Sequence, residues 1–302
     1  MKKLLVICGA TATGKTTLAV ECARLLGGEV VSCDALLVYR GLNIGTAKPT
    51  EKEMGGIPHH LIDVASPTES FSVSDFERLA LAAVEDILSR GKVPVLCGGT
   101  GFYMNAVLFK SSFGNIPADE AVRKKYEELV SREGVEALHG LLRACDPESA
   151  EKLHPNDVKR VIRALEIYEL TGRKKSEQND GNIPRYPYEA FCFEYPREEL
   201  YARIDRRVDE MFSAGLVEEV QGLLSAGVPE NAQCMQGIGY KEVVECLKNG
   251  DKHSTMSDII KKNTRNYAKR QLTFFKKMPN LHNIAPKAIG EAAQEVISIY
   301  ER

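Results

Sequence analysis

The chain has 302 residues, 43% of them hydrophobic, and its 40 Lys or Arg against 42 Asp or Glu leave a net charge of −2. This length suits one large α/β domain with an insertion, or two domains. No apolar run is long enough to cross a bilayer, and no signal peptide is expected, so we expect a soluble, cytoplasmic protein. The eight scattered cysteines include no C-x-x-C pair, which argues against disulfides and zinc sites. With so little net charge, a nucleic-acid partner would have to be held by local basic patches.

The first apolar run, Leu4 to Cys8, is expected to form a buried strand, and helical spacing begins about ten residues later. Between them lies an eight-residue match to G-x-x-x-x-G-K-[ST], made of Gly9, Ala10, Thr11, Ala12, Thr13, Gly14, Lys15 and Thr16. In such a phosphate loop the backbone N–H groups and the following helix N-terminus bind phosphate oxygens, and the lysine adds a positive charge. We therefore predict a site for a di- or triphosphate, with Thr16 as the protein ligand of Mg²⁺.

A second apolar stretch, residues 29–33, ends in Asp34. If it is a parallel strand, its carboxyl end lies at the same sheet edge as the phosphate loop, so Asp34 should point at the ligand. Asp34 is then a candidate general base or metal ligand, although an Asp at this position can also cap a turn or helix. His59 and His60 are adjacent, so on a strand they point to opposite faces, which favours structural roles over a shared metal site.

Helical spacing over residues 72–90 and an apolar strand over 93–97 continue this alternation. The strand leads into a second glycine-rich loop, Gly98-Gly99-Thr100-Gly101, where Thr100 offers a hydroxyl to the site. Alternating strands and helices specify a parallel sheet covered on both faces. The sequence therefore predicts an α/β fold of the P-loop NTPase type, a parallel sheet flanked by helices.

From residue 119 onward, helical patterns follow one another without strands until about Gly172. A returning strand is expected over 191–195. We therefore predict a P-loop core domain over 1–118 and 188–302, interrupted by an all-helical insertion domain over 119–187.

Two later segments carry basic residues. Residues 198–224 are expected to form one helix, in which Arg203, Arg206 and Arg207 could clamp a diphosphate. Residues 261–277 contain seven Lys or Arg and no acidic residue, and four of the seven share one helical stripe. This stripe favours a polyanionic partner over a merely solvated face.

Two classes of function fit these features. One is a small-molecule P-loop kinase, in which the carboxylate deprotonates an acceptor hydroxyl. The other is an enzyme that acts on a nucleic acid with a diphosphate co-substrate, and the basic stripe favours it.

Seven ordered motifs sharpen this choice, and together they resemble bacterial tRNA dimethylallyltransferases, the isopentenyl-tRNA transferase family. The motifs are residues 9–16, residues 32–49, Pro58-His59-His60-Leu61-Ile62-Asp63, Gly98-Gly99-Thr100-Gly101-Phe102-Tyr103, His154-Pro155-Asn156-Asp157, Gly237-Ile238-Gly239-Tyr240-Lys241 and residues 264–271. The resemblance extends from residue 4 to about residue 277.

The resemblance implies transfer of a dimethylallyl group from dimethylallyl diphosphate to N6 of the adenine at tRNA position thirty-seven, next to the anticodon, in tRNAs that read codons starting with U. The phosphate loop would then hold the leaving diphosphate, with Mg²⁺ as cofactor. Asp34 matches the carboxylate that accepts the N6 proton, Thr11 matches a catalytic residue of the loop, and Arg207 matches the arginine that contacts the diphosphate. Nothing in the sequence requires more than a monomer.

For the tRNA, the resemblance and the basic stripe together imply an anticodon stem gripped by the insertion domain. The implied contacts are Asp34, Ala35, Leu36, Leu37, Thr100, Arg123, Lys159, Arg160, Val161, Ile162, Arg163, Gly237, Gly239, Lys241, Lys269 and Arg270. The chain departs from the family where many members carry Ser and Gln in place of Ala35 and Leu37. It also carries Gln236 where some members have Arg.

Overall fold

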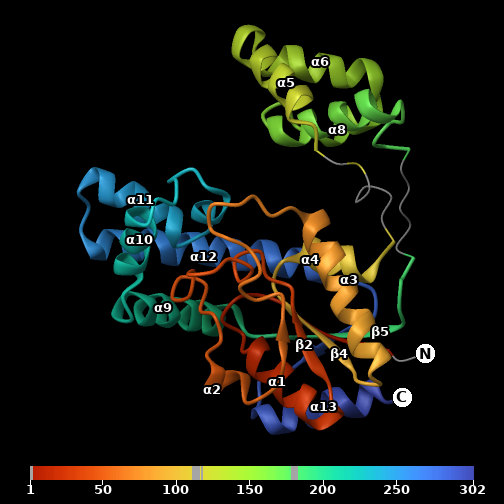
Figure 1. The fold of residues 1–302 in the computed structure, drawn as a ribbon, viewed down its shortest axis with the longest axis vertical. Helices are drawn as coiled ribbons and strands as arrows, with labels where there is room; N and C mark the ends of the chain where they lie inside the picture. The colour runs from red at the N-terminus through yellow and green to blue at the C-terminus, as the bar shows by residue number, and fades with distance from the viewer. Residues whose placement is uncertain (1–2, 111–115, 117, 178–182) are drawn as a thin grey trace. The chain divides into compact units, whose positions relative to one another are not determined.

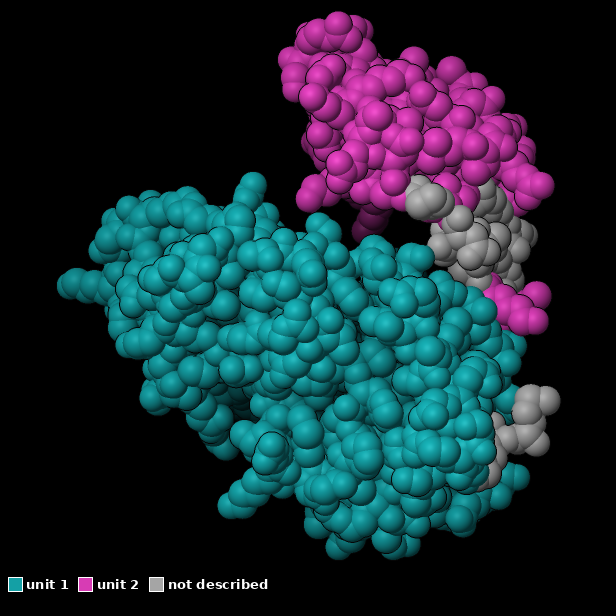
Figure 2. All heavy atoms as spheres, viewed as in Figure 1, with its two compact units in different colours: residues 1–108, 184–302 teal, residues 109–183 magenta. Residues whose placement is uncertain are grey.

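A computed structural model describes residues 3–110, 116, 118–177 and 183–302 of the chain. The chain divides into two compact units, residues 1–108 with 184–302 and residues 109–183, which Figure 2 shows in different colours. Among the described residues, no helix is long and apolar enough to cross a membrane.

The larger unit is built on a parallel sheet, in agreement with the predicted fold class. Its spatial strand order is β3-β2-β4-β1-β5-β6. The strands are β1 Leu4–Cys8, β2 Glu29–Ser32, β3 His59–His60, β4 Pro94–Gly98, β5 Tyr188–Phe193 and β6 Leu281–Ile284. Every pair of neighbours is parallel, so the carboxyl ends of all these strands lie at one edge of the sheet.

Helices cover both faces of this sheet because its strands are apolar on both sides. In Figure 1, α1 and α13 lie together beneath one face, where they share a core with β1, β4 and β5. α3 and α4 pack against each other, and α3 contacts β2 and β4. The helices of this unit, with one 3₁₀ helix η1, are α1 Lys15–Leu26, α2 Glu51–Met54, α3 Val73–Ser89, α4 Gly101–Leu108, α9 Arg197–Ser213, α10 Leu216–Ser225, η1 Gln233–Gln236, α11 Tyr240–Asn249, α12 His253–Phe275 and α13 Ile289–Tyr300.

Most helix positions follow the predicted spacing, but the C-terminal third of the chain differs from the prediction at two places. The single helix predicted over 198–224 is two helices, α9 and α10, which are separated at Ala214 and Gly215. Gly215 has a φ of 98°, a left-handed conformation that ends a right-handed helix and that a glycine adopts without strain. The C-terminal β6 and α13 were not predicted at all.

The smaller unit consists of helices in its described part, as the sequence predicts. They are α5 Glu120–Glu133, α6 Val135–Cys145, α7 Pro147–Lys152 and α8 Val158–Thr171. Their apolar faces form a separate core around Tyr126, Leu138, Leu142 and Leu165. The unit boundaries lie at 108/109 and 183/184, whereas the sequence predicts an insertion over 119–187. Residues 111–115, 117 and 178–182, near these boundaries, lie outside the described residues.

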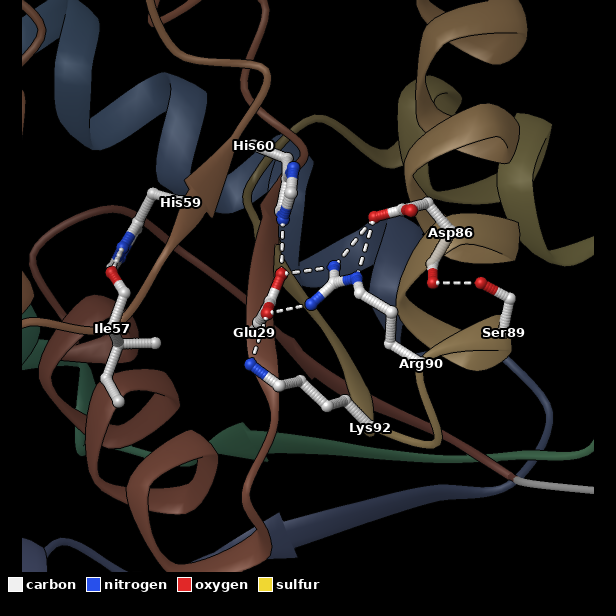
Figure 3. Close-up of polar contacts among 8 residues, drawn as sticks. All are labelled: Glu29, Ile57, His59, His60, Asp86, Ser89, Arg90 and Lys92. Carbon is white, nitrogen blue, oxygen red and sulfur yellow. Dashed lines mark hydrogen bonds and ion pairs between the residues drawn. The ribbon is translucent and has the colours of Figure 1, made fainter.

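The amino end of β2 is held by a buried carboxylate. Glu29 is 3% exposed at its side chain and binds Arg90 through two hydrogen bonds of 2.5 and 2.8 Å, and Lys92 at 2.7 Å. His60 of β3 adds a contact of 2.8 Å from its Nε2 atom, as Figure 3 shows. His60 thus has the structural role expected for it. The cluster fixes the start of β2, and the candidate site lies at the opposite end of the same strand.

Candidate active site at the carboxyl edge of the sheet

The predicted phosphate loop links β1 to α1. Gly9, Ala12 and Gly14 all have positive φ angles, of 124°, 62° and 87°, which curl the backbone between strand and helix. Of these three residues Ala12 is the strained one, because a residue with a Cβ rarely adopts a positive φ. α1 begins at Lys15, so the free N–H groups of its first turn face the loop. This is the strand, turn and helix arrangement that an anion site requires.

The carbonyl oxygen of Ala10 organises the loop. It accepts hydrogen bonds from the hydroxyl of Thr13 at 2.9 Å and from the ammonium group of Lys15 at 2.5 Å. Thr13 is buried, so its side chain braces the loop from inside the protein. Burial lowers the pKa of Lys15 because it penalises the charged form. An anion bound next to Lys15 would relieve that penalty.

Asp34 follows β2 and forms a turn. Its Oδ1 atom accepts hydrogen bonds from the backbone N–H groups of Leu36 at 2.9 Å and Leu37 at 3.3 Å. Oδ2 has no hydrogen-bond partner among the described residues, which leaves it available to a ligand. The hydroxyl of Thr100 accepts a bond of 3.1 Å from the N–H of Ala35, so the two loops that follow β2 and β4 are tied together. Asp34 therefore both shapes its turn and presents one oxygen to the site.

Two arginines one turn apart on α9 reach this edge. Arg207 donates from Nη2 to the carbonyl oxygen of Thr46 at 3.2 Å, while its buried Nε has no partner among the described residues. Burial lowers the pKa of Arg207, and the charge of Asp34 opposes that shift. Arg203 donates to the carbonyl oxygen of Ala12 at 2.8 Å. It therefore holds the strained residue of the phosphate loop, a role that the sequence did not reveal.

The three predicted catalytic residues and five of the nine predicted diphosphate-binding residues line one cavity of about 160 Å³, whereas Gly9, Ala10, Thr13 and Gly14 are not part of its wall. Of the sequence-predicted residues it contains Thr11, Ala12, Lys15, Thr16, Asp34, Leu36, Leu37 and Arg207. Sequence reasoning missed other residues of the wall, notably Ser32, His59, Met211, Thr264, Tyr267 and Gln271. A cavity of this size holds more than a single water, for which roughly 10–15 Å³ is enough.

An Mg²⁺ ion fits the donors of this cavity if phosphate oxygens complete its shell. Thr16 and Asp34 supply hard oxygen atoms, and Lys15 and Arg207 would neutralise a diphosphate beside them. In the described part of the chain, no group of three or more His, Cys, Asp or Glu side chains could hold a metal by itself. Mg²⁺ is commonly bound by one or two protein oxygens together with substrate phosphates and water, so this donor set suits it.

The structure corrects two predicted tRNA contacts in α8. Val161 and Ile162 are buried in the core of the smaller unit, at 0% and 5% exposed, so their side chains cannot reach a partner. The predicted contact range 159–163 is continuous in sequence, but helical periodicity turns two of its five residues inward.

Two predicted basic contacts are already paired. Arg123 contacts the buried carboxylate of Glu166 at 2.8 Å, and Arg163 contacts the same carboxylate at 2.5 Å. These hydrogen bonds hold the pKa of Glu166 below its usual range, against the effect of burial. Removing either arginine would therefore disturb the unit itself.

The remaining residues predicted to contact tRNA differ in whether their side chains already bind other residues of the protein. Arg160 pairs with Asp157, the residue just before α8, at 3.2 Å, and Lys241 pairs with Glu245 at 3.6 Å. Lys159 is exposed and has no polar partner among the described residues. Gly237 packs on Leu36, so closely that a Cβ there would lie 2.4 Å from a Leu36 methyl carbon. Gly239 has a φ of 97° at the start of α11.

The basic stripe of α12 is less free than its sequence suggests. Lys261 pairs with Asp209 at 2.6 Å and Arg265 with Asp205 at 2.5 Å, both on α9. In the first half of the stripe, part of the positive charge is therefore already balanced within the protein. Lys269 and Arg270 are exposed and lie near aromatic rings, which leaves them as the predicted contacts on this helix.

A family model described as IPP transferase matches residues 37–278, which is most of the chain. The chain belongs to the IPP transferase family. A curated tRNA dimethylallyltransferase of Geobacillus thermodenitrificans is 45% identical to it over 280 residues, which cover 91% of this chain and 88% of that protein. One of Acetivibrio thermocellus is 44% identical over 285 residues, covering 93% and 91% of the two chains.

Solved structures agree with this assignment. This IPP transferase matches the full-length tRNA isopentenylpyrophosphate transferase of Bacillus halodurans with a TM-score of 0.72 and 42% identity, covering 100% of this chain and 95% of that one. It matches a eukaryotic dimethylallyltransferase acting on tRNA with a TM-score of 0.85 and 30% identity, covering 100% and 79%. These relatives do not favour the kinase alternative.

Proposed function

We propose that this IPP transferase is a tRNA dimethylallyltransferase. It transfers a dimethylallyl group from dimethylallyl diphosphate to N6 of the adenine next to the anticodon, at position thirty-seven, in tRNAs that read codons starting with U. The observation that carries the proposal is that Thr11, Lys15, Asp34 and Arg207 line one cavity at the sheet edge. A phosphate loop beside a carboxylate suits a reaction in which a diphosphate leaves while a proton is removed.

In this reaction the bond from N6 to the prenyl carbon forms while the bond from that carbon to the diphosphate oxygen breaks. An exocyclic amine is a poor nucleophile because its lone pair is delocalised into the ring, so removal of its proton helps. Asp34 accepts that proton on its unpaired oxygen, and a positioned base of this kind contributes about 10²–10⁴-fold. The electron pair leaves with the diphosphate, whose charge Lys15, Arg207 and the loop N–H groups stabilise.

Mg²⁺, held by Thr16 and the diphosphate oxygens, would supply further charge neutralisation for the leaving group. Thr11 positions the diphosphate at the mouth of the loop. The apolar side chains of Ile204, Val208 and Met211 line the same cavity and suit a prenyl chain.

The adenine must leave its stack to reach Asp34, at a cost of a few kcal/mol, roughly, that contacts in the site offset. We assign binding of the anticodon stem to the helical unit through Lys159, and binding of the loop to the turn at Gly237 and to Lys269 and Arg270. A cytoplasmic location and a monomeric state fit this activity.

The experiment is a transfer assay. The protein is incubated with Mg²⁺, radiolabelled dimethylallyl diphosphate and an unmodified tRNA that reads codons starting with U, and the label is followed into RNA. We expect one labelled adenine, beside the anticodon, and no label in the same tRNA with guanine at that position. Absence of RNA labelling, together with phosphate transfer from ATP to a small acceptor, would instead indicate that the protein is a small-molecule kinase.

A further inference from the structure

Three buried polar atoms of the candidate site have no hydrogen-bond partner among the described residues. They are Ser32 Oγ, His59 Nε2 and Arg207 Nε, and all three residues line the same cavity. Buried polar groups are nearly always paired, so each unpaired atom points to something that binds there. The guanidinium of Arg207 is accounted for by a diphosphate, but Ser32 and His59 have no role in the proposed reaction.

The protonation of His59 can be assigned from its other ring nitrogen. Nδ1 lies 2.8 Å from the carbonyl oxygen of Ile57, and a carbonyl only accepts, so Nδ1 carries the hydrogen. Burial lowers the pKa of His59, which favours the neutral ring. Nε2 is therefore a bare acceptor. Figure 3 shows His59 bonded to Ile57, while the neighbouring His60 turns to Glu29.

The register of the sheet places His59 on the same face as Ser32, in the cavity that Thr16 also lines. His59 of β3 is paired with Val30 of β2, and Val30 and Ser32 both line the cavity, as their alternation along the strand requires. Ser32 is 4% exposed. The same cavity contains Thr16, the candidate Mg²⁺ ligand at the start of α1.

The chemistry of Nε2 restricts its partner. A neutral imidazole acceptor needs a hydrogen-bond donor, and the oxygen atoms of an ionised diphosphate are acceptors only. Mg²⁺ keeps several of its water molecules when it binds to proteins, and such polarised waters are strong donors. We propose, resting on the function proposed above, that His59 and Ser32 bind the hydration shell of the Mg²⁺ ion that Thr16 holds. They are positioning residues for the metal.

The test uses the full chain and inorganic pyrophosphate as the probe, with affinity measured by calorimetry with and without Mg²⁺. In the wild type, Mg²⁺ should strengthen pyrophosphate binding. His59→Phe keeps a ring but removes the acceptor, and it should reduce that strengthening by about three- to tenfold, the usual contribution of one hydrogen bond. Ser32→Ala should act in the same direction. In both variants the affinity without Mg²⁺ should remain unchanged.

Two variants serve as comparisons. His59→Gln can place an amide oxygen near the position of Nε2 and should restore most of the Mg²⁺ effect. His60→Phe changes the adjacent ring, which faces Glu29, and should leave the Mg²⁺ effect at the wild-type value. A full Mg²⁺ effect in folded His59→Phe would overturn the proposal, and so would an equal loss with and without the metal.

A measurement on the unmodified sequence covers the case in which His59→Phe does not fold. The ¹⁵N resonance of His59 Nε2 should shift when Mg²⁺ is added to the pyrophosphate complex, and no shift there would refute the contact. Failure of the wild type to bind pyrophosphate at all is a separate outcome. It would remove the phosphate-loop assignment and with it the proposed function.

Discussion

The backbone N–H of Thr11 donates a hydrogen bond of 2.9 Å to the side-chain oxygen of Gln271, which lies 260 positions later in the chain. The amide nitrogen of the same Gln271 donates to the carbonyl oxygen of Gly99 at 2.9 Å. One buried side chain of α12 thus joins the phosphate loop to the loop after β4. The family motif over residues 264–271 therefore contains a residue that holds the candidate site together, in addition to its exposed basic residues.

We predict that Gln271→Ala weakens use of dimethylallyl diphosphate. The change leaves the N–H of Thr11 and the carbonyl of Gly99 without their partner, and an unpaired buried group costs about 1–3 kcal/mol. The KM for the diphosphate should rise by about tenfold or more, since roughly 1.4 kcal/mol corresponds to tenfold. Gln221→Ala, on the exposed face of α10, is the matched control. An unchanged KM in Gln271→Ala would contradict the positioning role.

Asp34→Asn should bind both substrates and transfer slowly. The amide oxygen can still accept from Leu36 and Leu37, so the turn survives, but an amide cannot take up the N6 proton. We expect single-turnover transfer to slow by about 10²–10⁴-fold with little change in tRNA affinity. The exposed Asp258→Asn serves as the control. Near-normal turnover in Asp34→Asn would remove Asp34 as the base.

Lys15→Met should chiefly damage diphosphate binding. The ammonium group supplies a charge that the methionine lacks, while the chain length is nearly kept. Burial lowers the pKa of Lys15 in the free protein, so its charge is present below that pKa and lost as the pH rises through it. As the pH is raised, the affinity of the wild type for pyrophosphate should therefore begin to fall at a lower pH than it would if Lys15 were an exposed lysine, whose pKa is about 10.4. Lys15→Met should show weaker affinity and no such decline.

Sequence patterns predict local structure well in this chain because the decisive signals are local. The octet of the phosphate loop lies between an apolar strand and an amphipathic helix, and the structure has both. Gly215 ends a helix, but the helical spacing of apolar residues continues on both sides of it and predicts a single helix. Ala292, Ala293, Val296 and Tyr300 show the spacing of an amphipathic helix, and they form the buried face of α13.

What sequence reasoning could not supply were pairings between distant residues. Nothing near Gln271 indicates that its amide lies against Thr11, and nothing near Arg123 indicates the buried Glu166. The acidic partners of Lys261 and Arg265 lie on α9, so a window with seven positive charges seemed freer than it is. The histidine pair was assigned a structural role, which fits His60, whereas His59 lines the cavity.

The Glu29 cluster gives a stability prediction that is separate from catalysis. Hydrogen bonding by Arg90, more than any other contact, holds the pKa of Glu29 well below its usual range. Glu29→Gln should lower the free energy of unfolding by about 1–3 kcal/mol, because Arg90 and Lys92 are partly exposed and can rehydrate.

The effect should depend on pH in a defined direction. Because folding lowers the pKa of Glu29, its ionised carboxylate stabilises the folded protein at pH values above the unfolded-state pKa of about 4.3. That stabilisation is lost as the pH falls from this value towards the folded-state pKa. The difference between wild type and Glu29→Gln in urea unfolding should be present above about pH 5 and shrink as the pH falls below it. A difference that does not change with pH would mean that the ionised carboxylate is not its source.

The helical unit offers a test of tRNA binding in which charge and stability can be separated. Lys159 is exposed without a polar partner among the described residues, so Lys159→Gln should leave the fold intact. If Lys159 contacts a phosphate, tRNA affinity should fall and the slope of log affinity against log salt should decrease by about 0.7–0.9. Lys152→Gln, whose lysine pairs with Glu148 at 2.6 Å, is the control and should keep the wild-type slope.

By contrast, Arg163→Gln removes a partner of the buried Glu166 and should lower the thermal stability of the unit together with tRNA affinity. Equal salt slopes for Lys159→Gln and the wild type would identify this face of α8 as merely solvated.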